Sequence, residues 1–140
     1  MTTATAPSRL SALLNSGERL LRLSLRLDAV VTGANGIAYL ALAHPLERLL
    51  GLDSRAGLAI GAFLTAYGLA VAVVGSTARI NRVAASAVAI GNVTWVLASL
   101  AAVLSGALGL TTVGTVWAVL QAITVGAFAA LQYLGLRRAH

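Results

Sequence analysis

The sequence contains no cysteine and no lysine, and only four of its 140 residues are acidic. Without cysteine the chain has no disulfide, no thiolate metal ligand and no thiol nucleophile. The acidic residues are scattered along the chain, so neither a paired-carboxylate active site nor an acidic metal cluster is predicted. No glycine pattern joins a strand to a helix in the way that a phosphate-binding loop requires. We therefore expect a protein that is not an enzyme, has no catalytic residues and holds no metal or cofactor.

Charged residues are scarce and apolar residues are abundant. Hydrophobic residues make up 59% of the chain and charged residues 10%, with a mean hydropathy of +0.89, whereas about a quarter of the residues in soluble domains are charged. Four apolar runs without Lys or Arg are each near or above the ~17 to 25 residues that cross ~30 Å of hydrocarbon. They cover about residues 27–43, 57–75, 83–105 and 111–136. This pattern predicts an all-α, polytopic membrane protein, an up-and-down four-helix bundle in one transmembrane domain of residues 27–136.

The arginines are distributed unevenly between the two ends of this expected bundle. Eight of the ten precede the first run, separate the second from the third, or follow the fourth: Arg9, Arg19, Arg22, Arg26, Arg79, Arg82, Arg137 and Arg138. Only Arg48 and Arg55 fall at the other end, close to two acidic residues. Basic residues concentrate on the cytoplasmic side of membrane proteins, so we predict that both termini are cytoplasmic. The use of arginine without lysine, with abundant Ala, Gly, Val and Leu, is typical of a high-GC bacterial genome and places the protein in a bacterial cytoplasmic (inner) membrane.

Residues 1–26 are predicted to form a cytoplasmic leader, and residues 137–140 a short basic tail. Within the leader, leucines recur at helical spacing while arginines occupy another face. That pattern is typical of an amphipathic helix on the membrane surface, where arginines bind anionic lipid headgroups. The arginines assigned to this role are Arg19, Arg22 and Arg26.

Two local signals predict where helices begin and end. Asn15 and Glu18 have the spacing of a capping box, so a new helix is expected to start there and run into the first span. Pro45 disfavours helical geometry at the residue before it, so the first span is expected to stop at His44. A short interfacial turn should follow and end at Gly51.

Small residues recur at helical spacing in the second and fourth apolar runs. In lipid, apolar burial drives helix association only weakly, and small residues permit the close backbone contact that does. Such seams serve either packing within one chain, which we favour, or a homo-oligomer interface. The glycines concerned are Gly57, Gly61, Gly68, Gly75, Gly114 and Gly126.

Polar side chains inside the apolar runs are expected in two layers. An inner layer near the cytoplasmic boundary contains Asp28 and Gln132, where a juxtamembrane arginine or headgroup water can pair with the carboxylate; a proton relay is the alternative for Asp28. A middle layer, whose asparagines are ~12 to 14 Å from the cytoplasmic ends of their helices, follows from the helical rise. Its asparagines are Asn35 and Asn92, with Thr124, Gln121 or Tyr67 as possible partners. The candidate ligand-binding residues at this depth are Asn35, Tyr39, Asn92, Trp95, Gln121 and Thr124. Unpartnered amides are costly in hydrocarbon. The side chains of this layer therefore either hydrogen-bond one another and hold the helices together, or line a ligand pocket.

Four segments resemble those of small four-helix integral membrane proteins found in actinobacteria. They are residues 25–29 (LRLDA), 92–96 (NVTWV), 117–122 (WAVLQA) and 128–138 (FAALQYLGLRR). The resemblance covers the chain from about residue 25 to its end. It implies the same fold and a bacterial inner-membrane location, and it implies no activity, because that family has none firmly assigned.

Together these observations favour a non-enzymatic membrane protein that acts through helix–helix interaction, as an accessory or oligomeric component. Its expected partners are a bilayer with anionic headgroups and a second copy or another membrane protein. The alternative is a small-molecule or lipid binding or transport protein with a polar intramembrane pocket. No nucleic acid partner is expected, because the arginines flank the spans and form no basic patch interleaved with aromatic residues.

Overall fold

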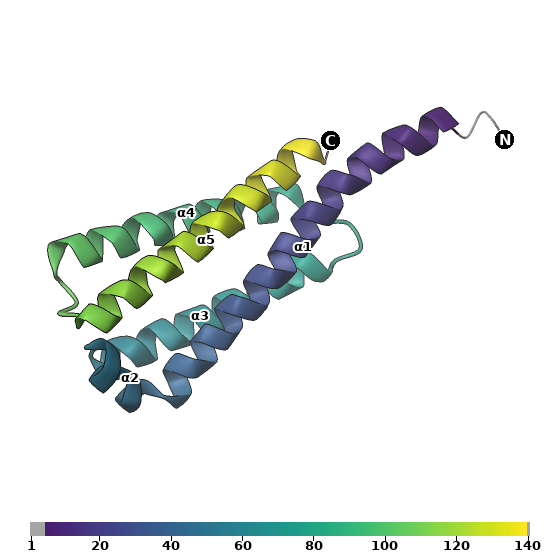
Figure 1. Ribbon diagram of the computed structural model, residues 1–140. Helices are drawn as coiled ribbons and strands as arrows, with labels where there is room; N and C mark the ends of the chain where they lie inside the picture. Colours follow the sequence, from purple (N-terminus) through teal and green to yellow (C-terminus); the bar gives the residue numbers. More distant parts are fainter. Residues whose placement is uncertain (1–4, 140) are drawn as a thin grey trace.

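The structure is a computed structural model that describes the backbone of residues 5–139 and the side chains of residues 16–139. The predicted all-α class is confirmed, because this part of the chain forms five helices and no strand (Figure 1). The helices are α1 (Thr5–Ala41), α2 (Ala43–Leu50), α3 (Ser54–Ser76), α4 (Arg82–Ser105) and α5 (Thr112–Arg138). Of these, α3, α4 and α5 are each long and apolar enough to cross a membrane. The described part of α1 and the short α2 meet the same criterion together, although a bend of 96° separates them.

Helices α3, α4 and α5 follow the predicted apolar runs within a few residues. Helices α4 and α5 each begin directly after a polar residue that caps them. The side chain of Asn81 accepts a hydrogen bond from the backbone N–H of Ala84 at 3.0 Å, and Thr111 accepts one from Gly114 at 3.0 Å. These bonds satisfy backbone donors that the first turn of a helix leaves free. Gly106 then ends α4 in the left-handed conformation, with φ of 70°.

Helix α1 is continuous through residues 15–18, so the predicted helix start at Asn15 and Glu18 is wrong. A capping box acts only where the preceding chain leaves the helix. Here tertiary packing overrides that local signal, because the Gly17 backbone lies directly against Arg138 and Ala139 at the end of α5. Leu21 is also buried in the protein core. The side chains of the expected surface leucines at positions 10, 13 and 14 lie outside the described residues, as do residues 1–4.

The bend after α1 has a steric cause. If α1 continued, the ring of Pro45 would clash with the carbonyl of Ala41, the residue four positions earlier. The helix therefore ends at Ala41, slightly before the predicted stop, and α2 begins at Ala43. Pro45 then lies in the first turn of α2, where no intrahelical partner for an N–H is needed. As predicted, Gly51 ends this short helix, with φ of 77°.

Among the four long helices, the neighbours α3 and α4 are packed together loosely, and we call the space between them the open seam. Helix α1 packs against α3, α5 packs against α4, and α1 and α5 join the two pairs. By contrast, α3 and α4 make few direct contacts. Figure 1 shows these two helices meeting near their connecting loop and separating toward the end that holds α2. The buried apolar cluster lies at the closed end and consists of Leu21, Leu25, Val71, Ile80, Ala85, Val88 and Leu136.

The predicted glycine seam on α3 packs against α1 of the same chain. A Cβ atom on Gly61 would lie 2.9 Å from the carbonyl oxygen of Gly36, and one on Gly68 would lie 2.9 Å from the backbone nitrogen of Gly33. Gly75 is similarly close to Leu25, at 3.1 Å. Each of these helices therefore presents glycine to the other, which brings the two backbones together. The glycines of α1 were not among the predicted seam residues.

The remaining seam glycines differ in their surroundings. Gly114 of α5 lies against the backbone of Leu50 at the end of α2. A Cβ atom on Gly57 would meet only the side chain of Leu52 at 3.8 Å, and one on Gly126 only Val96 at 3.9 Å. Both are ordinary van der Waals distances, so these two positions have room for a methyl group.

We predict that Gly61→Ala lowers the free energy of unfolding by about 1 to 3 kcal/mol, because the added methyl group forces α1 and α3 apart. Gly57→Ala, on the same helix, should be tolerated because only a flexible leucine side chain is near. Thermal unfolding of both variants in the same mild detergent checks this prediction. Equal unfolding temperatures would show that the close approach of α1 and α3 contributes nothing to stability.

Candidate functional site

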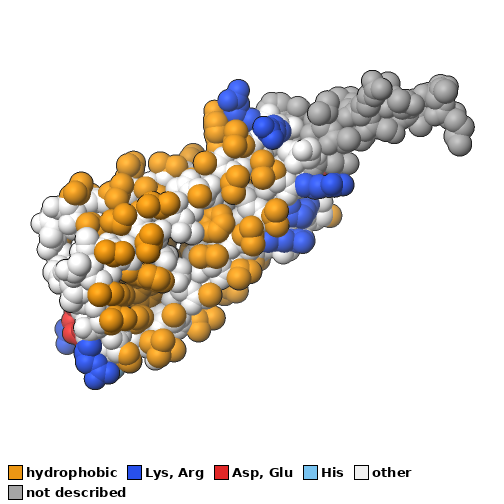
Figure 2. Space-filling view, in the orientation of Figure 1, with side chains coloured by type: hydrophobic (Ala, Val, Ile, Leu, Met, Phe, Trp, Pro, Cys, Tyr) orange, Lys and Arg blue, Asp and Glu red, His pale blue; other side chains and the backbone are white. Residues whose placement is uncertain are grey.

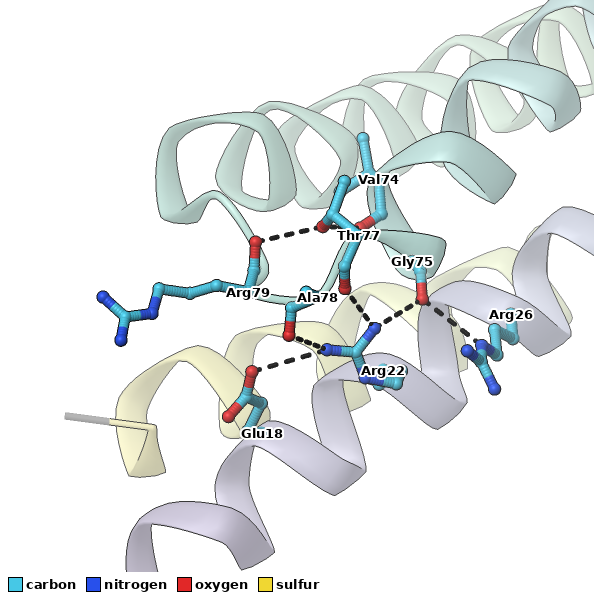
Figure 3. Close-up of polar contacts among 8 residues, drawn as sticks. All are labelled: Glu18, Arg22, Arg26, Val74, Gly75, Thr77, Ala78 and Arg79. Carbon is cyan, nitrogen blue, oxygen red and sulfur yellow. Dashed lines mark hydrogen bonds and ion pairs between the residues drawn. The ribbon is translucent and has the colours of Figure 1, made fainter.

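Arginines at the closed end of the molecule bind the ends of neighbouring helices. The guanidinium group of Arg22 donates hydrogen bonds to the carbonyl oxygens of Gly75 at 3.0 Å, Thr77 at 2.6 Å and Ala78 at 3.1 Å (Figure 3). Nε of Arg26 donates to Gly75 at 3.3 Å. The last turn of a helix leaves its carbonyl groups without partners and carries a partial negative charge, so cations are favourable there.

Two further groups complete this arrangement. Glu18 forms an ion pair with Arg22 at 3.5 Å, one turn apart on α1. Arg82 donates to the carbonyl oxygen of Leu136 at 2.9 Å and so caps the end of α5. Arg19 is exposed. Of the arginines assigned to anionic lipid, Arg22 and Arg26 therefore have carbonyl partners within the protein. Figure 2 shows basic groups at the two ends of the molecule and an apolar surface between them.

We predict that Arg22→Ala destabilises the protein by about 1 to 3 kcal/mol, since three charge-assisted hydrogen bonds to carbonyl groups in the last turn of α3 and just after it are lost. Amide hydrogen exchange should accelerate in residues 75–80, next to the uncapped end of α3. Arg19→Ala is the matched control, because Arg19 lies on the same helix and is exposed. Similar exchange in the two variants would rule out a capping role for Arg22.

The side chain of Asp28 on α1 is completely buried, at 0% exposed. Its Oδ1 accepts a hydrogen bond from the hydroxyl of Thr32 at 2.8 Å. Its Oδ2 accepts from Asn92 Nδ2 on α4 and from Gln132 Nε2 on α5, both at 2.8 Å. Asn92 also donates to Gln132 Oε1 at 3.0 Å. Three long helices thus meet in one hydrogen-bonded cluster, which we call the Asp28 cluster.

Helix α3 joins this cluster through Tyr67. The Tyr67 hydroxyl lies 3.1 Å from Asn92 Oδ1 and 3.0 Å from the carbonyl oxygen of Val88, and it can donate to either. Among the described side chains, no buried nitrogen or oxygen lacks a hydrogen-bond partner. The cluster is therefore fully satisfied, as groups inside hydrocarbon must be.

Two predictions about the polar layers are wrong. Asp28 pairs with no arginine among the described residues, and Asn92 belongs to the inner cluster rather than to the middle layer. The cause is a longitudinal offset between helices. Gly75, near the end of α3, lies against Leu25 of α1, so Asp28, three residues later, lies ~4.5 Å deeper than that point, at 1.5 Å of rise per residue. Counting residues from the apolar boundary of each helix cannot detect such an offset.

Two hydrogen-bonded pairs join α1 to α5 and involve Asn35, Gln121 and Tyr39 of the candidate ligand-binding residues. Asn35 Nδ2 donates to Gln121 Oε1 at 2.9 Å. Nearer the end that holds α2, the indole N–H of Trp117 donates to the Tyr39 hydroxyl at 3.0 Å. Thr124 does not join them, because its hydroxyl donates to the carbonyl oxygen of Leu120 in its own helix.

A cavity of about 280 Å³ lies beside these pairs. Its wall includes all four paired residues together with Trp95 of α4. Leucines from the α2–α3 and α4–α5 connections close it at one end: Leu50, Leu52, Leu108 and Leu110. This roof is held by Thr111, whose backbone N–H and hydroxyl each donate at 2.9 Å, to the carbonyl oxygens of Leu50 and Leu49 respectively.

A second cavity of about 280 Å³ continues the first along the seam between α3 and α4. The two share wall residues: Thr32, Leu64, Trp95, Ala98 and Val125. The second cavity extends to Tyr67 and Asn92 at the Asp28 cluster. Phe63 of α3 is 52% exposed at its edge and stacks on Trp95 of α4, with ring centroids 5.7 Å apart. The open seam thus leads from the surface into the space beside Asn35 and Gln121.

The two cavities are therefore lined by five of the six candidate ligand-binding residues, and Thr124 lines neither cavity. Sequence reasoning missed Phe63 and the roof leucines, because nothing in an apolar run distinguishes a side chain that lines a cavity from one that faces lipid. Among the described residues, no group of three or more His, Asp or Glu side chains could hold a metal ion.

Comparisons with known proteins add no assignment to this geometry. No family model, curated protein or solved structure matches the chain. The resemblance to the actinobacterial membrane family remains a prediction, and any function must be argued from the site itself.

We predict that Asn92→Leu destabilises the protein by at least about 1 to 3 kcal/mol, because the buried Asp28 and Gln132 side chains each lose a hydrogen-bond partner. Thr94→Val on the same helix is the control, since its exposed hydroxyl bonds only its own helix. Chemical or thermal unfolding in detergent measures both variants. Equal stability of N92L and T94V would show that the Asp28 cluster does not hold the helices together.

Proposed function

We propose that the chain is a four-span protein of the bacterial inner membrane, with both termini in the cytoplasm. Three apolar helices and the bent pair of α1 and α2 support four spans. Arginines gather at the end of the molecule where α1 enters and α5 leaves, and this asymmetry supports the orientation by the positive-inside rule. In this arrangement α2 and the α4–α5 connection face the outer side.

Within that membrane, the protein binds a small molecule or lipid that enters from the bilayer between α3 and α4. The observation that carries this proposal is the pair of adjoining cavities that reaches the open seam between these helices. Ligand sites are concave and mostly apolar, with a few polar groups placed for orientation. The cavities have this character, since apolar side chains surround the Asn35 and Gln121 amides.

Binding is favoured over the helix–helix interaction function that the sequence suggested. That function used the small-residue seams as interfaces, yet Gly61, Gly68 and Gly75 are occupied by α1 of the same chain. The middle-layer side chains also adjoin open space rather than filling the interior. Binding or carriage is favoured over catalysis because the cavity walls include no charged side chain to act as acid, base or nucleophile.

We predict that Ala98→Trp abolishes retention of a bound molecule, because Ala98 lines both cavities and the indole would fill the space they share. Native mass spectrometry of the full chain, released from the membrane in gentle detergent, measures retention. Ala101→Trp is the matched control, since Ala101 lies on the same helix, is exposed and lines neither cavity. The wild type and A101W should carry a small molecule or lipid in fixed ratio. An empty wild type, or equal retention by A98W, would contradict the proposed function.

A further inference from the structure

The chemistry of the cavity walls restricts the ligand. Neither cavity is lined by an Asp, Glu, Lys, Arg or His side chain. The nearest buried charged group, Asp28, lines neither cavity, and both of its oxygens already accept hydrogen bonds within the Asp28 cluster. A charged ligand group would lose its hydration here without gaining an ionic partner, which is strongly unfavourable. The part of the ligand inside the cavity is therefore uncharged.

The wall nevertheless offers hydrogen bonds that the described side chains leave unused. Asn35 gives one amide N–H to Gln121, but its own Oδ1 and the Gln121 Nε2 group have no partner among the described residues. The Tyr39 hydroxyl accepts a bond from Trp117 and has its own proton to donate. Neither Asn35 Oδ1 nor Gln121 Nε2 is fully enclosed by protein, because every fully buried polar side-chain atom described has a partner. Asn35, Gln121 and Tyr39 all line the first cavity, so a ligand there can reach these groups.

A hydrocarbon chain alone would leave these groups unpaired. Gln121 lies nine residues into α5, or ~14 Å from its start, which is well inside ~30 Å of hydrocarbon. Water is scarce at that depth, so an unpaired amide is costly there. A hydroxyl or carbonyl oxygen on the ligand can accept from Gln121 or Tyr39, and a hydroxyl can also donate to Asn35.

The shape of the cavities sets the rest of the molecule. On α4 their walls extend from Gly91 to Val103, which is ~18 Å at 1.5 Å per residue. The hydrogen-bonding groups lie on α1 and α5, whereas the opening lies between α3 and α4, beside Phe63 and Trp95. A ligand that reaches Gln121 with its polar end therefore has its apolar part in the cavity and toward the bilayer. The volume of about 280 Å³ in each cavity suits one chain.

We propose that the ligand is an uncharged single-chain amphiphile, a neutral lipid whose terminal hydroxyl or carbonyl group binds Asn35, Gln121 and Tyr39. This inference rests on the proposed function and narrows its ligand class. The polar end enters first through the seam between α3 and α4, and the chain lies along the aromatic side chains of Phe63 and Trp95. Anionic and cationic lipids are excluded, because their headgroups would have to leave the interface.

The test uses the full chain in detergent and three probes with the same brominated long alkyl chain, namely an alcohol, an alkane and an alkyl sulfate. Both native tryptophans line the first cavity, but Trp117 is 37% exposed, so the part of the bromine quenching that saturates with probe concentration reports occupancy, and quenching below refers to that part. We expect the alcohol to bind at least about tenfold more tightly than the alkane, which corresponds to 1.4 kcal/mol for the hydrogen bonds. The sulfate should not quench above its effect on A98W, in which the cavity is filled.

Substitutions identify the groups that recognise the alcohol. Gln121→Leu should weaken alcohol binding at least about tenfold, to the level of the alkane, and leave alkane binding unchanged. Thr124→Val is the control on the same helix and should change neither, because Thr124 lines neither cavity. If Q121L does not fold, Tyr39→Phe removes a single donor and should reduce the same preference for the alcohol.

The outcomes separate the ligand class from the binding function. Equal affinity for alcohol and alkane, unaffected by Q121L, would overturn the neutral-amphiphile assignment while quenching lost in A98W still supported the site. Tighter binding of the sulfate, sensitive to A98W, would overturn it in favour of an anionic lipid. Quenching that is the same in the wild type and A98W for every probe would overturn both the ligand class and the proposed function.

Discussion

Hydrogen bonds among buried polar side chains hold together helices that apolar burial alone would not associate in lipid. The carboxylate of Asp28 receives donors from α1, α4 and α5, and Tyr67 adds α3 through Asn92. These bonds fix the closed end of the molecule, next to the arginines that cap α3 and α5. Toward the other end, no hydrogen bond among the described side chains joins α3 to α4, and the stacked rings of Phe63 and Trp95 cross a seam with few other contacts, beside which the cavities lie. The position of the Asp28 cluster thus determines where the protein is packed and where it is open.

Much of the helical framework could be predicted from the sequence, because its signals are local. The apolar runs located α3, α4 and α5, and Gly51 was correctly identified as the end of α2. The start of the first helix was not predictable, because packing of Gly17 against α5 overrides a capping signal at residues 15–18. The depth of Asp28 was also not predicted. It depends on the position of α1 relative to α3 along the helix axes, which the sequence of one helix alone does not determine.

The candidate site shows the same division between local and tertiary information. The pairing of Asn35 with Gln121 agrees with their predicted common layer, because both depths follow from residue counts along nearly whole spans. Thr124 was assigned to that layer by depth alone, but its hydroxyl satisfies its own helix. Whether amides adjoin a cavity depends on the separation of α3 and α4. Helices α3 and α4 are separated because few contacts hold them together. Sequence periodicity predicts which faces are apolar, but it does not predict which apolar faces remain apart.

The roof over the first cavity has a further consequence. Because Pro45 turns the chain across the end of the molecule and Thr111 fastens α2 to α5, the cavities have their opening along the side and not through the top. A molecule held there exchanges with its lipid neighbours in two dimensions. Occupancy is then governed by the mole fraction of that molecule in the bilayer, and dilution of the surrounding water has no direct effect on it. Under the proposed function, the protein therefore samples the composition of the membrane rather than that of either aqueous compartment.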